Sequence, residues 1–406
     1  MPVEQWIGLV VLVLAAMGAG WLLARWRNAP IARNGAPFPR ADYFKGLNFL
    51  LNEQPDKAIE VFIRMVEVDS DTVETHFALA SLFRRRGEVD RAIRLHQNLI
   101  ARPNLSRTHR YQALRELGED YMRAGLFDRA ESLFLELVDV RPHMEAALRQ
   151  LVAIYEQQKD WDQAIAMRRK LETATGENQN AIIAQYFCEL AAAQADGDGR
   201  SALRLLKRAQ SFDRDSVRAG IMLGELALRG GEPALAIRHF RRVLESEPVF
   251  ASEVLPGMAA AFRAMNDAGG FDELVRTLVA RSPTAAGEVA LAAILRPEIA
   301  TAETERCVGE YIRTSQSLAG LQEILTATTG EAAAQLEPAH VQPLEKALRR
   351  LLSQGAGYRC DQCGYAGKTL YWQCPSCRGW GTTRPHHDFS LGPRAHAVSH
   401  LAPARV

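Results

Sequence analysis

The chain has 406 residues, of which 47% are hydrophobic and 24% charged, and its formal net charge at pH 7 is +1. This length allows about two or three domains, and the composition is that of an ordinary globular protein rather than a disordered chain. The near-neutral charge gives no electrostatic footprint for nucleic acid, so we predict no nucleic-acid partner.

An uncharged run of eighteen residues, 7–24, lies near the N-terminus between Trp6 and Trp26. As a helix it covers about 27 Å at ~1.5 Å per residue, which is close to the ~30 Å hydrocarbon core of a bilayer. The preceding residues contain Glu4 and no Lys or Arg, which favours a permanent anchor over a cleaved signal peptide. We therefore predict a transmembrane anchor over residues 1–27.

Arginines directly after this run predict its orientation, because positively charged flanks stay on the cytoplasmic side. They are Arg25, Arg27, Arg33 and Arg40. The large C-terminal remainder is thus expected to be cytoplasmic. Three prolines between residues 28 and 40 predict an extended linker there.

The central part of the chain repeats itself, with alanines in similar settings at Ala58, Ala92, Ala130, Ala164, Ala202 and Ala236. Successive spacings are 34, 38, 34, 38 and 34 residues. A 34-residue period is that of tetratricopeptide helix pairs. We predict such repeats over residues 41–283, including a seventh with Leu274 at the alanine position and its turn at Gly269, Gly270 and Asp272.

Small residues twelve positions before these alanines should let the two helices of a pair approach closely. They include Gly46, Gly118 and Gly224, and large aromatics follow the matching alanines at Phe62, Phe134 and Phe240. Stacked pairs form a superhelix with a concave face suited to holding another protein. Residues 284–354 are expected to form degenerate helical repeats, ending in an amphipathic helix with Leu344 and Leu352 that docks the next domain.

Motifs for catalysis are missing from the sequence, which has no Gly-rich phosphate loop, no H-E-x-x-H and no G-x-S-x-G. Cys188 and Cys307 sit in helix-like apolar patterns that indicate packing residues rather than nucleophiles. We therefore predict no catalytic residues, no organic cofactor and no enzymatic activity.

Two Cys-x-x-Cys pairs ten residues apart, Cys360 with Cys363 and Cys374 with Cys377, are the sharpest chemical feature. Four thiolates suit a closed tetrahedral site for one metal ion, either zinc or iron. Two disulfides or four unrelated thiols are the alternatives, which the paired spacing in a domain expected to be cytoplasmic disfavours. Residues 355–384 are too few to bury a sufficient core alone, so the metal should supply part of the folding free energy.

Aromatic residues crowd the same segment at Tyr358, Tyr365, Tyr371, Trp372 and Trp380. We interpret them as a small core and a docking face on a neighbouring domain, in preference to a nucleic-acid stacking platform. Residues 385–406, which include His386 and His387, are predicted to form a mobile tail. The predicted fold is an all-α tetratricopeptide superhelix with an N-terminal transmembrane helix and a small C-terminal rubredoxin-like, zinc-ribbon β domain.

The order of these parts, together with residues 42–51 (DYFKGLNFLL), 87–94 (GEVDRAIR) and 370–377 (LYWQCPSC), resembles the lipopolysaccharide assembly protein B family of Gram-negative bacteria. The resemblance covers nearly the whole chain. The chain departs from the family pattern in its anchor sequence and in its longer, histidine-bearing tail. It implies that Cys360, Cys363, Cys374 and Cys377 bind the metal.

The resemblance also implies a bacterial inner-membrane adaptor that promotes destruction of the lipid A-committing deacetylase (LpxC) by the membrane protease FtsH. Other lipopolysaccharide assembly proteins are further expected partners, and a homo-oligomer stays open. Two alternatives are a membrane-tethered scaffold without a protease link and a rubredoxin-type electron-transfer protein.

Overall fold

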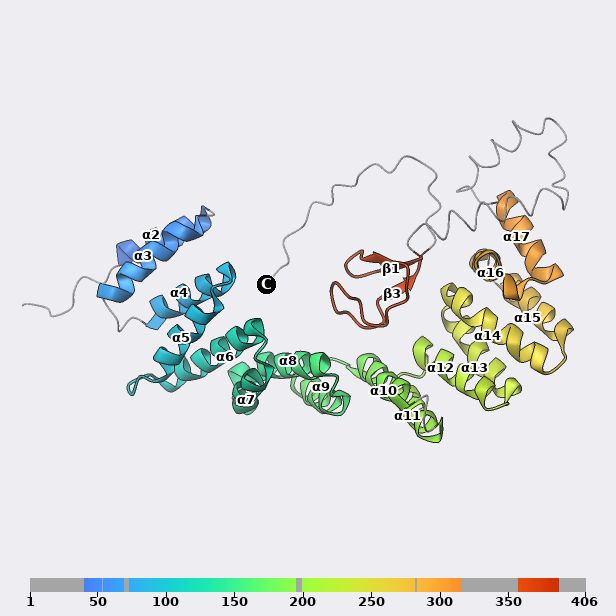
Figure 1. Cartoon of the computed structure of the whole chain (residues 1–406), viewed down its shortest axis with the longest axis horizontal. Helices are drawn as coiled ribbons and strands as arrows, with labels where there is room; N and C mark the ends of the chain where they lie inside the picture. The colour runs from blue at the N-terminus through green and yellow to red at the C-terminus, as the bar shows by residue number, and fades with distance from the viewer. Residues whose placement is uncertain are drawn as a thin grey trace, which may run out of the picture. The chain divides into compact units, whose positions relative to one another are not determined.

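A computed structural model describes residues 40–52, 54–68, 73–194, 199–281, 283–314 and 357–386 (Figure 1). The chain divides into two compact units, 1–147 and 148–406, and each is considered by itself. Within the described ranges, no helix combines the length and apolar character needed to cross a bilayer. The predicted anchor, residues 28–39 of the linker and the predicted docking helix around Leu344 lie outside these ranges, and helix α2 begins at Arg40, which the linker was predicted to include.

The first unit consists of successive antiparallel helix pairs. Its helices are α2 (Arg40–Leu51), α3 (Pro55–Val68), α4 (Val73–Arg86), α5 (Val89–Ile100), α6 (Arg107–Ala124) and α7 (Phe127–Leu137), and α8 (Arg141–Gln158) runs into the second unit. Their core contains apolar side chains such as Phe62, Leu79 and Phe83. The structure therefore confirms helical repeats in this part of the chain.

The second unit continues the helix pairs and carries a small sheet. Its helices are α9 (Trp161–Thr175), α10 (Asn180–Gln194), α11 (Gly199–Phe212), α12 (Val217–Arg229), α13 (Pro233–Ser246), η1 (Pro248–Phe250), α14 (Ala251–Ala264), α15 (Ala268–Arg281), α16 (Pro283–Leu295), η2 (Pro297–Ile299) and α17 (Ala302–Thr314). The strands β1 (Tyr358–Cys360), β2 (Ala366–Gly367) and β3 (Thr383–Pro385) form an antiparallel sheet in the order β2-β1-β3.

The repeat register agrees with the alanine spacing. Each of the six alanines is the fourth residue of the second helix in its pair, from Ala58 in α3 to Ala236 in α13. All six are at most 2% exposed, so their methyl groups are packed in the helical core.

Close helix approach within a pair depends on glycine. A Cβ atom added to Gly118 would lie 2.7 Å from the ring of Phe134, and one added to Gly224 would lie 2.3 Å from the ring of Phe240. Both rings are at most 1% exposed. The glycine and the aromatic residue sixteen positions later therefore form one packing unit, as the sequence pattern predicts.

The turn of the seventh pair lies earlier than predicted. Helix α15 begins at Ala268, so Gly269 and Gly270 belong to its first turn rather than to the preceding loop. The reversal occurs at Asn266, whose φ is +54°, and the Asp267 carboxylate accepts a hydrogen bond of 2.9 Å from the Gly270 amide. This side-chain cap starts the helix before the glycines can form a loop.

The end of the repeats and the start of the tail can also be compared with the predictions. Helices α16 and α17 form one further pair, so the predicted helical character continues to Thr314. Strand β3 includes Pro385, which was predicted to belong to the tail, and the His386 amide donates to the Gly357 carbonyl at 2.9 Å. Backbone pairing across the sheet thus carries the ribbon to residue 386, whereas His387 lies outside the described residues.

Candidate metal centre and its docking face

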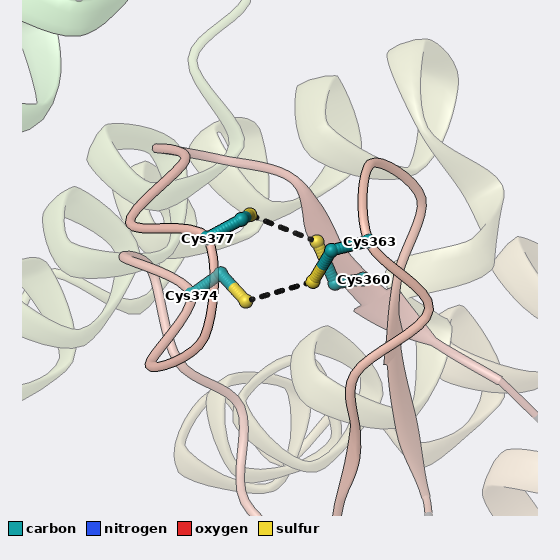
Figure 2. Close-up of side chains that lie close together, drawn as sticks. All are labelled: Cys360, Cys363, Cys374 and Cys377. Atoms are coloured by element: carbon teal, nitrogen blue, oxygen red, sulfur yellow. Dashed lines mark hydrogen bonds between the residues drawn. The ribbon is translucent and has the colours of Figure 1, made fainter. Parts of the chain in front are cut away.

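The four predicted cysteines converge between the two Cys-x-x-Cys turns of the ribbon (Figure 2). Cys360 ends strand β1, and its Sγ lies 3.7 Å from the Sγ of Cys377. The Sγ atoms of Cys363 and Cys374 are also 3.7 Å apart, and all four sulfurs lie within 4.8 Å of one another. Among the described residues, this is the one group of three or more His, Cys, Asp or Glu side chains close enough to share a metal ion.

The two Cys-x-x-Cys turns have the same backbone geometry. The Gly364 amide donates to the Cys360 carbonyl at 2.9 Å, and the Arg378 amide donates to the Cys374 carbonyl at the same distance. Both donors have positive φ, +74° at Gly364 and +60° at Arg378. Glycine adopts this conformation readily, whereas arginine does so at a cost, so the second turn must be held by its surroundings.

The sulfur geometry fits a tetrahedrally bound ion. Zinc–sulfur bonds of ~2.3 Å require sulfur–sulfur separations of about 3.8 Å. Two of the six separations, at 3.7 Å, match that edge length, and all six are within 4.8 Å. Iron accepts the same donor set, so the four thiolates form a site for one metal ion, zinc or iron.

Cys360 and Cys377 differ in how readily their thiols ionise. Burial opposes ionisation of Cys360, yet hydrogen bonding with Thr382 and with the Cys363 and Gln362 backbone lowers its pKa to about 6. Burial raises the pKa of Cys377 to about 12, and the neighbouring sulfurs add to this shift. Four adjacent thiolates repel one another, and a divalent cation removes that repulsion when it binds.

One end of the ribbon is anchored on helices α8, α9 and α10 through Trp380. Its ring meets Trp161 and Tyr186 edge-on, with centroids 5.8 and 5.5 Å away. Its indole N–H donates 3.2 Å to Glu156 Oε1, and the Gln373 amide donates 3.3 Å to Glu156 Oε2. The aromatic pair and the carboxylate together form a socket for this tryptophan.

Two helix residues, Arg168 and Tyr186, hold the Glu156 carboxylate of this socket in place. Arg168 lies 3.3 Å from Glu156 Oε1, and the Tyr186 hydroxyl also donates to this oxygen. Burial raises the pKa of Tyr186 above its usual value, so the hydroxyl stays protonated and remains a donor. Glu156 therefore joins the repeat core to the ribbon through a charge-assisted network.

The other end of the ribbon rests on α12, η1 and α14. Trp372 stacks on Phe250 with centroids 6.0 Å apart, and the Arg218 guanidinium lies 5.7 Å from its ring centre. The Tyr358 hydroxyl donates 2.6 Å to Glu253 Oε1. The Arg384 guanidinium adds an ion pair of 2.7 Å with Glu247, which contributes less because both side chains are partly exposed.

The aromatic residues thus confirm the predicted docking face, since three of them carry the contacts to the helices. Their partners, including Glu156, Trp161 and Phe250, were not identified from the sequence. They lie more than one hundred residues away along the chain and belong to helices that are otherwise ordinary repeat members. Cys188 and Cys307 are buried in the helical core, as predicted, and burial raises the pKa of both thiols.

Family models match the parts that the geometry defines. A rubredoxin metal binding domain matches residues 358–385, and tetratricopeptide repeat models match residues 75–109, 115–177 and 191–249. The C-terminal part of a tetratricopeptide repeat protein from Cytophaga hutchinsonii is 14% identical, with a TM-score of 0.38 over 60% of this chain and 96% of that chain.

Two similar relatives span almost the full length. Lipopolysaccharide assembly protein B from Escherichia coli K12 is 33% identical over 378 residues, which cover 93% of this chain and 97% of the relative. The protein of that name from Haemophilus influenzae is 30% identical over 386 residues, with the same two coverages. Repeats, ribbon and full-length similarity together show that the chain belongs to the lipopolysaccharide assembly protein B family.

Proposed function

We propose that this chain is a non-enzymatic adaptor of the bacterial inner membrane that acts in lipopolysaccharide assembly. The similarity over 93% of the chain to relatives named lipopolysaccharide assembly protein B carries this proposal. In its specific form, the adaptor presents the lipid A-committing deacetylase LpxC to the membrane protease FtsH and helps to organise other lipopolysaccharide assembly proteins.

Three features of the chain support an adaptor. The uncharged run at residues 7–24, followed by arginines, would hold the protein in the membrane with its bulk on the cytoplasmic side. The helix pairs offer an extended surface of the kind that binds proteins. The ribbon bridges helices from α8 to α14 within the second unit, so it would keep that surface in one shape.

The metal centre supports a structural role in this adaptor. Cys360 and Cys374 are each 1% exposed, and the ribbon around them places its tryptophans against helices rather than toward solvent. A closed tetrathiolate site has no open position for a substrate. The metal would therefore stabilise the folded ribbon, and the ribbon would hold the helices it contacts, from α8 to α14, in one arrangement.

The proposal is tested by depleting the protein in its host and following the half-life of LpxC after translation is blocked. We expect LpxC to persist several-fold longer, and a wild-type copy to restore its turnover. Cys374→Ser should fail to restore it, whereas Cys307→Ala, which alters a cysteine outside the metal centre, should succeed. An unchanged half-life on depletion would reject the protease link and favour the membrane-tethered scaffold.

An electron-transfer protein is a second candidate, because Cys363 is exposed and offers one sulfur to solvent. This candidate requires iron that changes oxidation state. Purified protein that is coloured and bleaches on reduction would support it. Colourless protein that contains zinc would exclude it and leave the structural role.

A further inference from the structure

A groove of about 710 Å³ opens between helices α11, α12 and α13, away from the ribbon contacts. Leucines form its floor: Leu203, Leu223, Leu226 and Leu235. Leu223 is buried, whereas the other three are only half-buried and present apolar surface to the groove. Its size is within the range of about 300–1,000 Å³ that is typical of binding sites.

The segment that contains this groove has a strongly positive net charge. Residues 199–242 contain ten Arg or Lys and four Asp or Glu, a net charge of +6, whereas the whole chain has +1. Arg200 and Arg229 line the groove itself. Among the described residues that line it, Glu232 is the one that is acidic. The leucine floor is therefore bordered by a positive rim.

The pKa of His239, which lines the groove, responds to nearby positive charge. Burial lowers its pKa, and the nearby Arg238, Arg242 and Lys207 lower it further. These three cations act on one imidazole from two helices, α11 and α13. Arg242 is paired with Asp215 at 2.9 Å, whereas Arg238 and Lys207 add positive potential beside His239 that would favour an anionic group there.

The ribbon and the groove use different parts of helix α12. Arg218, in the first turn, faces Trp372 of the ribbon, whereas Leu226 and Arg229, in the last turns, face the groove. No ribbon residue is among the groove's lining residues. A partner can therefore occupy the groove while the ribbon stays docked.

We propose that this groove binds an acidic segment of a partner protein, with apolar side chains on the leucine floor and carboxylates on Arg200 and Arg229. A lipid headgroup would satisfy the arginines but would leave the three half-buried leucines uncovered. An amphipathic acidic helix satisfies both, because its apolar residues recur on one face and its acids border that face. This site is independent of the proposed role in lipopolysaccharide assembly.

The test measures fluorescence anisotropy of labelled peptides with the full-length protein in detergent. The probe is a synthetic peptide of about fourteen residues, or four helical turns, with Leu on one face and Glu on the other. Two matched probes replace every Glu by Lys or every Leu by Ser. We expect only the acidic, leucine-bearing probe to bind, and its affinity to fall as salt concentration rises.

Charge-reversal variants locate the binding. The double variant Arg200→Glu with Arg229→Glu should weaken the acidic probe about fivefold or more, the effect of two exposed charge pairs. Arg214→Glu is the matched control, because Arg214 is exposed between α11 and α12, at the ends of those helices that do not line the groove. It should leave the affinity within twofold, roughly the scatter of surface substitutions.

Three results would overturn the proposal. The acidic probe could fail to bind, it could bind the double variant as tightly as the wild type, or the Leu→Ser probe could bind equally well. A soluble short-chain phosphatidylglycerol serves as the competing ligand. If it binds in a way that the double variant abolishes while the acidic leucine peptide does not bind, the groove is a headgroup site instead.

Discussion

The ribbon and the helix pairs are stabilised in opposite ways. In the helix pairs, apolar residues at a fixed spacing bury one another, as Ala130 and Phe134 do with no exposed surface. In the described part of the ribbon, only Cys360, Cys374, Thr383 and Pro385 are buried. Sulfur occupies the centre of the ribbon, and its tryptophans pack on the helices instead of on one another.

This difference shows where each part obtains its folding free energy. A helix pair needs only its neighbours in sequence, so its stability is a sum of local terms. The ribbon needs two external contributions, a metal ion and a surface more than one hundred residues away. Loss of either should therefore affect the ribbon while the helices persist.

The largest effect is expected from removing the metal or a ligand. A structural zinc contributes roughly 10–16 kcal/mol of apparent binding free energy, so Cys374→Ser or a strong chelator should unfold the ribbon. Hydrogen exchange should show loss of amide protection over residues 358–385, while far-UV circular dichroism keeps its helical intensity. Cys307→Ala is the control with an intact site, and protected ribbon amides in metal-free protein would contradict the prediction.

The docking surface is tested by Trp380→Ala, which empties the socket of Trp161 and Tyr186. Buried tryptophans at such contacts contribute about 2–4 kcal/mol, so the ribbon should undock without losing its metal. Exchange protection should fall in β1 and β3 while metal content stays at one ion per chain. Tyr371→Ala removes a ribbon aromatic that is 41% exposed and should change little. Equal effects of the two substitutions would refute the socket.

The helix pairs are tested by Gly118→Ala. The added Cβ would lie 2.7 Å from the ring of Phe134, which is fully buried, so the packing around this ring would have to shift. Such overpacking costs about 1–3 kcal/mol and should lower the thermal unfolding midpoint. A Cβ on Gly269 meets nothing within 4 Å, so Gly269→Ala should be neutral or stabilise by at most about 1 kcal/mol. Matching losses in both variants would mean that helix approach does not require glycine.

The smallest effect concerns Glu288 in α16, a carboxylate whose Oε2 is buried with no hydrogen-bond partner among the described residues. Burial raises its pKa from 4.5 to about 7. The folded state therefore binds a proton that the unfolded chain releases, and the stability lost through this group accumulates as pH rises from 4.5 toward 7.

Substitution by glutamine should remove that pH dependence. Glu288→Gln is expected to stabilise the protein by about 1 kcal/mol near pH 8 and to change little below the unfolded pKa. Thermal unfolding at both pH values measures this difference. Glu298→Gln alters an exposed carboxylate in the following 3-10 turn and should show no such dependence. A variant whose gain is the same at both pH values would contradict the assignment.

Prediction from the sequence succeeded where contacts are local. The alanine period located the six second helices, and the glycine and aromatic positions identified residues that touch within one pair. The same approach placed the turn before α15 too late, because it gave weight to Gly269 and Gly270 and none to the Asp267 cap. Capping by one side chain decides a helix start more directly than two flexible residues nearby.

The sequence by itself determined the repeat architecture and the four sulfur ligands, because both depend on short, regular spacings along the chain. Only the tertiary structure decided what the ribbon rests on: Glu156, Trp161 and Phe250 meet it across distant segments. It also decided that leucines and arginines of three helices border one groove. Such contacts have no period, since they arise from how successive helix pairs stack rather than from how any one pair folds.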